Sequence, residues 1–328
     1  MKSTNAAFDV GIHRALMFCA AVVLLFTLNP PHSIFAQGQL TPPGAPAPTM
    51  KTLVEIEPRT PISSLPYNIS VSGSYYLTTN LTGQAGTNGI TVSTDNVTID
   101  LNGFALIGVP GSLDGISVLA PLTNHRNLAV HDGSICHWGG DGVDISGADN
   151  SQIERLRVSQ NGAHGLFIGA ESLVANCTVQ SNSSSGIRAG AGTVVNSCTA
   201  SANLTAGIEN YRFNNDVTAS LIKGCSVHDN LGAGIQGSAV VMDNVCAGNT
   251  SAGIFMNGSG GRAEGNYLRQ NGTGISTGGS SSTNVLVRNT LVFNTNAFSI
   301  SGVGNIVGPI INAAGVATNI NPNANYSF

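Results

Sequence analysis

The sequence predicts an all-β fold, a solenoid of about ten coils wound as a parallel β-helix and capped at both ends. A repeated phrase, a strand-like alternation inside it and a low content of charge predict this fold. The phrase has two apolar residues two positions apart, then an Asn, a Gly four residues later in most repeats, and an apolar residue directly after the Gly. A repeat of about 22 residues is typical of one coil in a solenoid. The repeated asparagines are Asn161, Asn182, Asn203, Asn230, Asn249, Asn271 and, in a weaker match, Asn294.

Each repeat predicts two short strands joined by bends. Leu156 and Val158 alternate with Arg157 and Ser159, which is the period of a strand with one face inward. The apolar residue after the Gly begins a second strand. Asn suits the bend between the strands because it tolerates the left-handed conformation and bonds to nearby backbone. Stacked coils should therefore carry a ladder of Asn amides. Charged residues make up only 9% of the chain, which suits polar but uncharged turns.

The cysteines predict a column in the core. Cys177, Cys198 and Cys225 each stand nine residues before the repeat Gly and should stack on one another. Neighbours about 4.8 Å apart at Cα could form a disulfide. Buried Cys is also a good small apolar filler, and we favour free thiols. No spacing of Cys and His indicates zinc.

The first 36 residues predict a secretory signal peptide. Lys2 and Arg14 precede an apolar run over 15–28, and Ala36 is a suitable last residue before cleavage. The run is shorter than the roughly 20 residues that span a bilayer, so no membrane span is expected after cleavage. The mature protein would be secreted, periplasmic or at the cell surface. The expected divisions are 1–36 signal peptide, 37–50 Pro-rich linker, 51–108 N-terminal cap and first coils, 109–316 parallel β-helix, and 317–328 C-terminal cap or tail.

The repeats resemble right-handed parallel β-helix repeat proteins, the group that includes the pectin lyase-like folds. The opening segments PISSLPYNISVSGSYYLTTNLTG (61–83) and GITVSTDNVTIDLNGFALIG (89–108) resemble the start of exported bacterial β-helix proteins that are uncharacterised. The resemblance covers about residues 60–320. It implies a right-handed solenoid and no particular activity.

The densest charge lies over 124–145 and the coil after it. Repeat alignment places Asp141 beside His164, and Asp132 beside Arg155. These four residues are the catalytic candidates. A carboxylate–imidazole pair would transfer protons, and Arg155 or Arg157 would hold an acidic sugar. The alternative, which we favour, is weak pairing of solvated turn charges. Trp138 stands where the ladder Asn would be, and we expect it to cap the ladder.

A second candidate surface lies at the longest coil, between Asn203 and Asn230. An insertion over 210–217 would adjoin the outward position two residues after the repeat Gly. The insertion is either one side of a binding face or a tolerated loop. The outward column is Asp144, Phe167, Arg188, Glu209, Gln236 and Phe255. The binding candidates are Arg157, Arg188, Glu209, Tyr211, Arg212 and Phe213.

Composition and missing motifs limit the function. A net charge of −4 without a basic segment gives no reason to expect a nucleic-acid partner. The sequence has none of the Asp clusters of pectate lyases or the catalytic sets of polygalacturonases and alginate epimerases. We therefore expect no metal and no cofactor. The leading hypothesis is an exported scaffold that binds polysaccharide or associates with the cell surface. The alternatives are a lyase, hydrolase or epimerase of acidic glycans, and a structural adhesin.

Overall fold

The computed structural model describes residues 57–118, 125–211, 219–312 and 321–328. The predicted signal peptide and linker lie outside these residues, as do Arg212 and Phe213. The described residues from Glu57 onward form one compact unit built from strands, turns and loops. Within them, no helix is long and apolar enough to cross a membrane.

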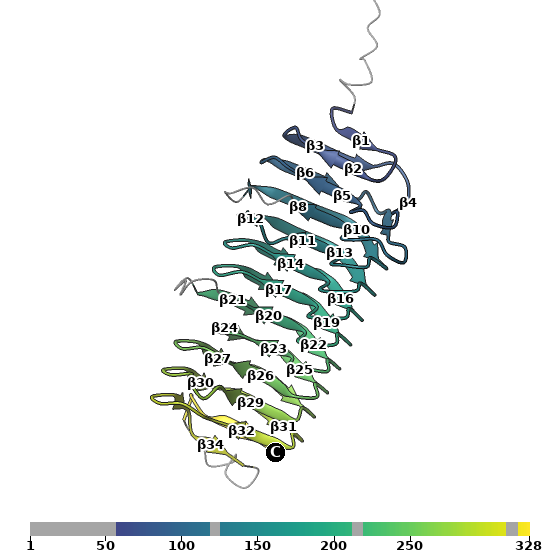
Figure 1. Ribbon diagram of the computed structural model, residues 1–328. Coiled ribbons are helices and arrows are strands. Elements are labelled where there is room, and N and C mark those ends of the chain that lie inside the picture. Colours follow the sequence, from purple (N-terminus) through teal and green to yellow (C-terminus); the bar gives the residue numbers. More distant parts are fainter. Residues whose placement is uncertain (1–56, 119–124, 212–218, 313–320) are drawn as a thin grey trace, which may run out of the picture. The chain divides into compact units, whose positions relative to one another are not determined.

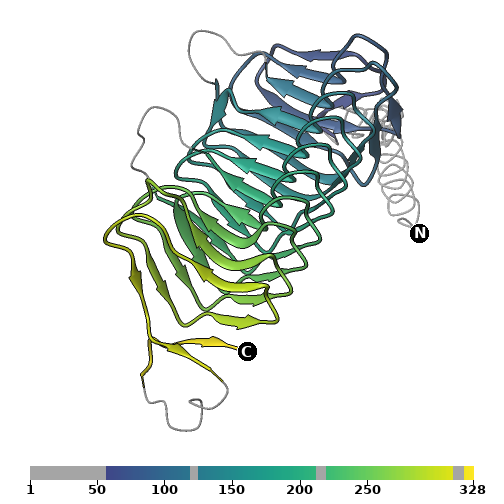
Figure 2. The same ribbon diagram turned by 60° about the horizontal axis from the view of Figure 1, so that its bottom comes forward.

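The described chain winds into a parallel β-solenoid (Figures 1 and 2), as predicted. One parallel sheet has eleven strands, one from each successive coil, which agrees with about ten turns. Its strands are β2 (Tyr67–Ile69), β5 (Ile90–Val92), β8 (Ile116–Val118), β11 (Val143–Ile145), β14 (Leu166–Ile168), β17 (Ile187–Ala189), β20 (Ile208–Asn210), β23 (Ile235–Gln236), β26 (Ala252–Met256), β29 (Thr273–Thr277) and β32 (Asn296–Ser299).

A second sheet of 22 strands contains two parallel rows that merge in the long strands β10 (Leu128–Cys136) and β13 (Gln152–Ser159). The first row also contains β1 (Thr60–Ile62), β3 (Gly73–Leu77), β6 (Val97–Asp100), β15 (Leu173–Ala175), β18 (Val194–Asn196), β21 (Ser220–Lys223), β24 (Ala239–Met242), β27 (Arg262–Glu264), β30 (Val285–Val287) and β33 (Ile306–Val307). The second row contains β4 (Leu81–Thr82), β7 (Ala105–Ile107), β16 (Thr178–Gln180), β19 (Thr199–Ser201), β22 (Ser226–His228), β25 (Val245–Ala247), β28 (Tyr267–Arg269), β31 (Thr290–Val292) and β35 (Asn325–Ser327), with β34 (Ile310–Ile311) beside β35. Strands β9 (His125–Arg126) and β12 (Ala148–Asp149) form a separate pair.

The inward columns match the predicted pattern. The residue after each repeat Gly lies in register with its counterparts on the neighbouring coils, and its side chain is at most 1% exposed. Burial of these aliphatic side chains supplies the main favourable contribution to folding. The members of this column from β11 to β29 are Val143, Leu166, Ile187, Ile208, Ile235, Ile254 and Ile275.

The Asn ladder is confirmed, and it is continuous from Asn161 to Asn294. The side-chain N–H of Asn161 donates to Oδ1 of Asn182 at 3.0 Å, and the backbone N–H of Asn161 donates to the same oxygen at 3.1 Å. This double donation repeats at each step to Asn294, where the two distances are 2.9 Å. The backbone N–H of Trp138 donates to Asn161 Oδ1 at 3.1 Å, so Trp138 caps the ladder as predicted.

A second buried ladder was not predicted. Asn244, Asn266, Asn289 and Asn325 form the same double contacts, with side-chain distances of 3.0, 2.9 and 3.1 Å. This ladder extends the cysteine column, because the backbone N–H of Cys225 donates to Asn244 Oδ1 at 2.9 Å. All five described cysteines are free thiols, as favoured above. Each thiol of the column donates to a backbone carbonyl two residues before it at 3.3 Å. The accepting carbonyls belong to Ala175, Asn196 and Lys223.

Removal of one ladder amide should destabilise the whole stack. Asn203→Ala takes away the acceptor of two N–H groups of Asn182 and the side-chain donor to Asn230, all of them buried. We expect the free energy of unfolding to fall by about 1–3 kcal/mol. Chemical denaturation would measure it, with the exposed Asn68→Ala as control. Equal stability of the two variants would contradict a structural ladder.

Candidate functional site

The register separates the predicted charges into two clusters on different sheets. The His131 cluster, on the 22-stranded sheet, comprises Asp100, His131, Asp132, Glu154 and Arg155. The Arg188 cluster, on the eleven-stranded sheet and the turn before it, comprises Asp141, His164, Phe167, Arg188, Glu209 and Tyr211. The segment that looked like one charged region in the sequence thus serves two surfaces.

Arginine pairing dominates the His131 cluster. Asp132 and Arg155 occupy equivalent left-handed bends of adjacent strands, and Arg155 binds both carboxylate oxygens of Asp132 at 2.6 and 2.8 Å. Its remaining terminal nitrogen donates to Glu154 at 2.6 Å. The hydrogen bonds from Arg155 lower the pKa of Asp132 to about 2, and a hydrogen bond from Gln152 lowers the pKa of Glu154. Both carboxylates therefore remain ionised near neutral pH and are poor proton donors.

His131 lies between two carboxylates. Its Nδ1 is 2.9 Å from Asp132 and 3.7 Å from Asp100, and the three side chains offer ligand atoms within 4.8 Å of one another. Such a set has the donor types that divalent metals accept. Arg59 binds Asp100 at 2.7 Å, however, and Arg155 binds Asp132. Because two guanidinium groups already neutralise the carboxylates, we interpret the set as an ion-pair network.

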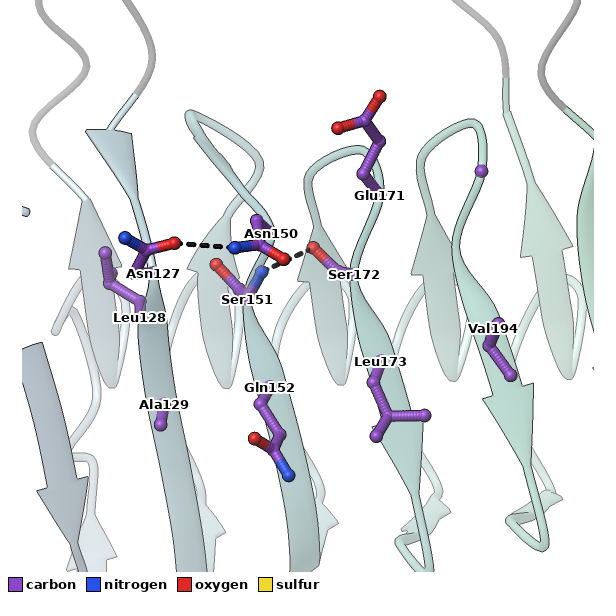
Figure 3. Close-up of a pocket in the computed structure, with 11 residues that line it drawn as sticks. Asn127, Leu128, Ala129, Asn150, Ser151, Gln152, Glu171, Ser172, Leu173 and Val194 are labelled. Atoms are coloured by element: carbon purple, nitrogen blue, oxygen red, sulfur yellow. Dashed lines mark hydrogen bonds between the residues drawn. The ribbon is translucent and has the colours of Figure 1, made fainter. Parts of the chain in front are cut away.

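A groove runs beside the His131 cluster, across β10, β13, β15 and β18 (Figure 3). Its volume is about 460 Å³, and it adjoins a depression of about 330 Å³ that reaches His131, Glu154 and Arg155. The two share Ala129 and Gln152. Four outward residues from successive coils lie in register along the floor: Ala129, Gln152, Leu173 and Val194.

A row of exposed amides forms the rim of this groove. The side-chain N–H of Asn127 donates to Asn96 at 2.7 Å, and that of Asn150 donates to Asn127 at 2.6 Å. All three are exposed and adopt left-handed backbone angles at the start of a strand. Each amide has more hydrogen-bonding positions than these contacts use. The next coil places Glu171 at the same bend.

Sequence reasoning missed the groove, although a signal for the rim was present. The segments NVTI (96–99), NLAV (127–130) and NSQI (150–153) share one pattern, an Asn three residues before an inward aliphatic residue. Their spacings of 31 and 23 residues obscured the repeat. The predicted binding residue Arg157 is outside the groove lining, and its Nε donates to Ser134 at 3.1 Å.

In the Arg188 cluster, the guanidinium group lies between two aromatic rings. The outward column Asp144, Phe167, Arg188 and Glu209 is in register, as the repeat alignment predicts. The central carbon of the Arg188 guanidinium is 4.8 Å from the ring centres of both Phe167 and Tyr211. Arg188 Nε is 3.7 Å from Glu209. The hydroxyl of Tyr211 donates to the carbonyl of Ile168 at 3.3 Å, which ties the start of the insertion to an earlier coil.

The carboxylate–imidazole pair that the catalytic alternative would place between Asp141 and His164 is not formed. Asp141 Oδ1 instead accepts the backbone N–H of His164 at 2.5 Å, and the imidazole Nδ1 of His164 accepts the backbone N–H of Ser185 at 3.2 Å. Asp114 accepts the N–H of Asp141 in the same way at 2.8 Å. Each side chain satisfies the turn of the following coil, so the structure lacks the direct pair that the catalytic alternative requires.

Burial changes the protonation of both groups. It raises the pKa of Asp141 to about 7, with further contributions from the nearby Asp144 and Asp114 carboxylates. Burial, followed by the positive charge of Arg188, lowers the pKa of His164. Near neutral pH, His164 is therefore neutral and Asp141 is only partly ionised.

The coil repeat and the parallel sheets are those of a β-helix protein. The model for the right-handed beta helix region matches residues 67–236 and 216–292, so the chain belongs to this family. A search of curated protein sequences found no significant match.

Solved structures that are similar in fold include the following three. The A-modules of the mannuronan C-5 epimerases AlgE4 and AlgE6 from Azotobacter vinelandii are 13% and 14% identical, with TM-scores of 0.56 and 0.55. The matches cover 82% and 76% of this chain and 90% of each module. The Dettilon tailspike protein is 14% identical with a TM-score of 0.51, over 82% of this chain and 60% of the tailspike. At these identities the likeness concerns the fold alone.

Neutralisation of Asp141 should change how stability depends on pH. The pKa of Asp141 in the folded protein is about 7, which lies above the ordinary value of 3.8. The contribution of Asp141 to the free energy of unfolding is therefore fully present below about pH 4 and is lost as the pH rises through 7. Asp141→Asn retains an acceptor and removes this loss. We expect the free energy of unfolding of Asp141→Asn to exceed that of the parent protein by about 1–2 kcal/mol at pH 8, a figure discounted for partial exposure. Near pH 4 the difference should be much smaller. Denaturation at both pH values would measure it, with the exposed Asp243→Asn as control. A pH-independent difference would contradict the raised pKa.

Proposed function

We propose that this protein binds a polysaccharide chain along the groove of the 22-stranded sheet. The observation that carries the proposal is the combination of an in-register floor containing three aliphatic residues with a rim of exposed amides. Sugar rings present C–H faces that suit an aliphatic floor, and their hydroxyl groups suit amide donors and acceptors. Floor positions from Thr98 to Val194 span five coils, or about 19 Å at 4.8 Å per step.

The comparisons support a polysaccharide rather than another ligand. Two of the similar structures are modules of enzymes named for their action on mannuronan. A solenoid of this kind presents an elongated surface with one outward position per coil, which suits a polymer with a repeating unit.

Binding is better supported than catalysis. The carboxyl group with a pKa near neutrality, Asp141, belongs to the Arg188 cluster and does not line the groove. The carboxylates next to the groove are held ionised by Arg155 and Gln152. Acid–base catalysis is the second candidate because His131 lines the adjoining depression. Its test is the release of reducing ends or of unsaturated products from bound polymers, compared between the parent protein and His131→Ala.

We also propose export to the cell exterior or periplasm. The N-terminal charges, apolar run and small residues before Gln37 support it. Mass spectrometry of the mature protein from fractionated cells would find an N-terminus near Gln37. An intact N-terminus in the cytoplasmic fraction would contradict export.

A bulky side chain on the groove floor should block binding. Ala129→Trp fills the point that the groove and the depression share, whereas Ser276→Trp makes the same change on the outward column of the eleven-stranded sheet. An array of neutral and acidic polysaccharides would identify ligands, and titration would follow. We expect Ala129→Trp to weaken binding at least about tenfold, equivalent to 1.4 kcal/mol, with Ser276→Trp unchanged. Absence of any bound polysaccharide would favour the structural adhesin. Unchanged binding by Ala129→Trp would place the ligand elsewhere.

A further inference from the structure

We infer that the groove accepts uncharged polysaccharides and excludes polyuronates. The inference rests on the proposed function and names the chemical class of its ligand. It departs from what the likeness to mannuronan epimerases would suggest, because mannuronan carries one carboxylate on every sugar unit.

The described residues that line the groove and its depression carry more negative than positive charge. Glu154 and Glu171 are the acidic members, Arg155 is the basic member, and no Lys is among them. Arg155 is already paired with carboxylates, because three of its nitrogens donate to Asp132 and Glu154. One guanidinium charge thus faces two ionised carboxylates, whose pKa values are lowered by these and neighbouring hydrogen bonds.

Arg59, next to the His131 cluster, is already paired with carboxylates as well. Arg59 binds Glu57 at 2.8 Å and Asp100 at 2.7 Å. Glu171, at the bend before β15 on the coil after that of Glu154, extends from its turn away from the other side chains drawn in Figure 3. A polymer that runs across the groove from coil to coil therefore passes carboxylates on two adjacent coils.

These charges act differently on the two classes of polymer. The hydroxyl groups of a neutral glycan can donate to Glu171 or Glu154 and bond to the rim amides. A uronate carboxylate has no proton to donate at neutral pH. It would approach like charges in a groove whose described lining residues include no Lys, and whose one Arg is already paired with carboxylates. Like-charge juxtaposition is an effective way to reject a competing ligand of the same shape.

The experiment compares a polymer with its own oxidised form. The panel includes mannan, xylan and a β-glucan beside polymannuronate and polygalacturonate. The neutral polymer that binds best is then oxidised at its primary hydroxyl, or, where the sugar has none, substituted with carboxymethyl groups, so that it carries carboxylates. We expect the charged form to bind at least about tenfold more weakly at low salt, with the difference shrinking near 0.5 M NaCl, where charges are screened within a few ångströms.

A charge-neutral variant separates repulsion from loss of a hydroxyl contact. Glu171→Gln keeps the side-chain length, and Gln160 and Gln270 already adopt the left-handed angle of that bend in this chain. We expect Glu171→Gln to recover at least about threefold of the lost affinity for the charged polymer, and Asp243→Asn to recover none. Recovery by neither salt nor Glu171→Gln, or tighter binding of a polyuronate than of every neutral polymer, would overturn the inference and leave the proposed function intact. Failure of every polymer to bind would instead overturn the proposed function.

Discussion

The stack of coils depends on side chains that satisfy the backbone at each bend. A strand of three residues hydrogen-bonds well to its neighbours, but the bends leave N–H groups that no strand accepts. In the main ladder, Asn Oδ1 accepts both the backbone and the side-chain N–H of the preceding coil. Because every member is both donor and acceptor inside the core, each one needs its neighbours. The row therefore has to run unbroken until a residue such as Trp138 can end it.

The same device recurs with different exposure on other sides of the solenoid. The second row of asparagines is buried, the row of Asp114, Asp141, His164 and Ser185 is partly buried, and the row of Asn96, Asn127 and Asn150 is exposed. Of these three rows, the row of Asn96, Asn127 and Asn150 is the one whose members are all exposed to solvent. Since aliphatic columns fill the interior, a ligand would bind on the outside, and the proposed polysaccharide groove lies where the exposed row adjoins an aliphatic floor.

The sequence was sufficient for the features that repeat and insufficient for those that do not. The ladder, the inward columns, the Trp138 cap and the outward register of Arg188 all follow from a constant spacing. The second ladder was not predicted, because its repeat position holds two residue types. Cys177, Cys198 and Cys225 begin the column that Asn244 continues. The groove was not predicted, because its depth depends on where the surrounding turns lie. Repeat alignment left a direct pair of Asp141 and His164 open as an alternative, because it cannot show that the backbone of the next coil competes for both side chains.

The pKa of Asp141 shows why an unusual titration does not by itself mark an active site in this fold. Its carboxylate is held in a half-buried turn because the N–H of His164 requires an acceptor there, and that burial raises its pKa to about 7. Asp132 has the opposite shift for an equally structural reason, since the cation of the next coil lies directly beside it. In a solenoid, each outward side chain has a neighbour about 4.8 Å above and below, so pKa shifts arise from stacking alone. The site is therefore better argued from shape and unsatisfied hydrogen-bonding capacity, and by those measures the groove is favoured over either cluster of charges.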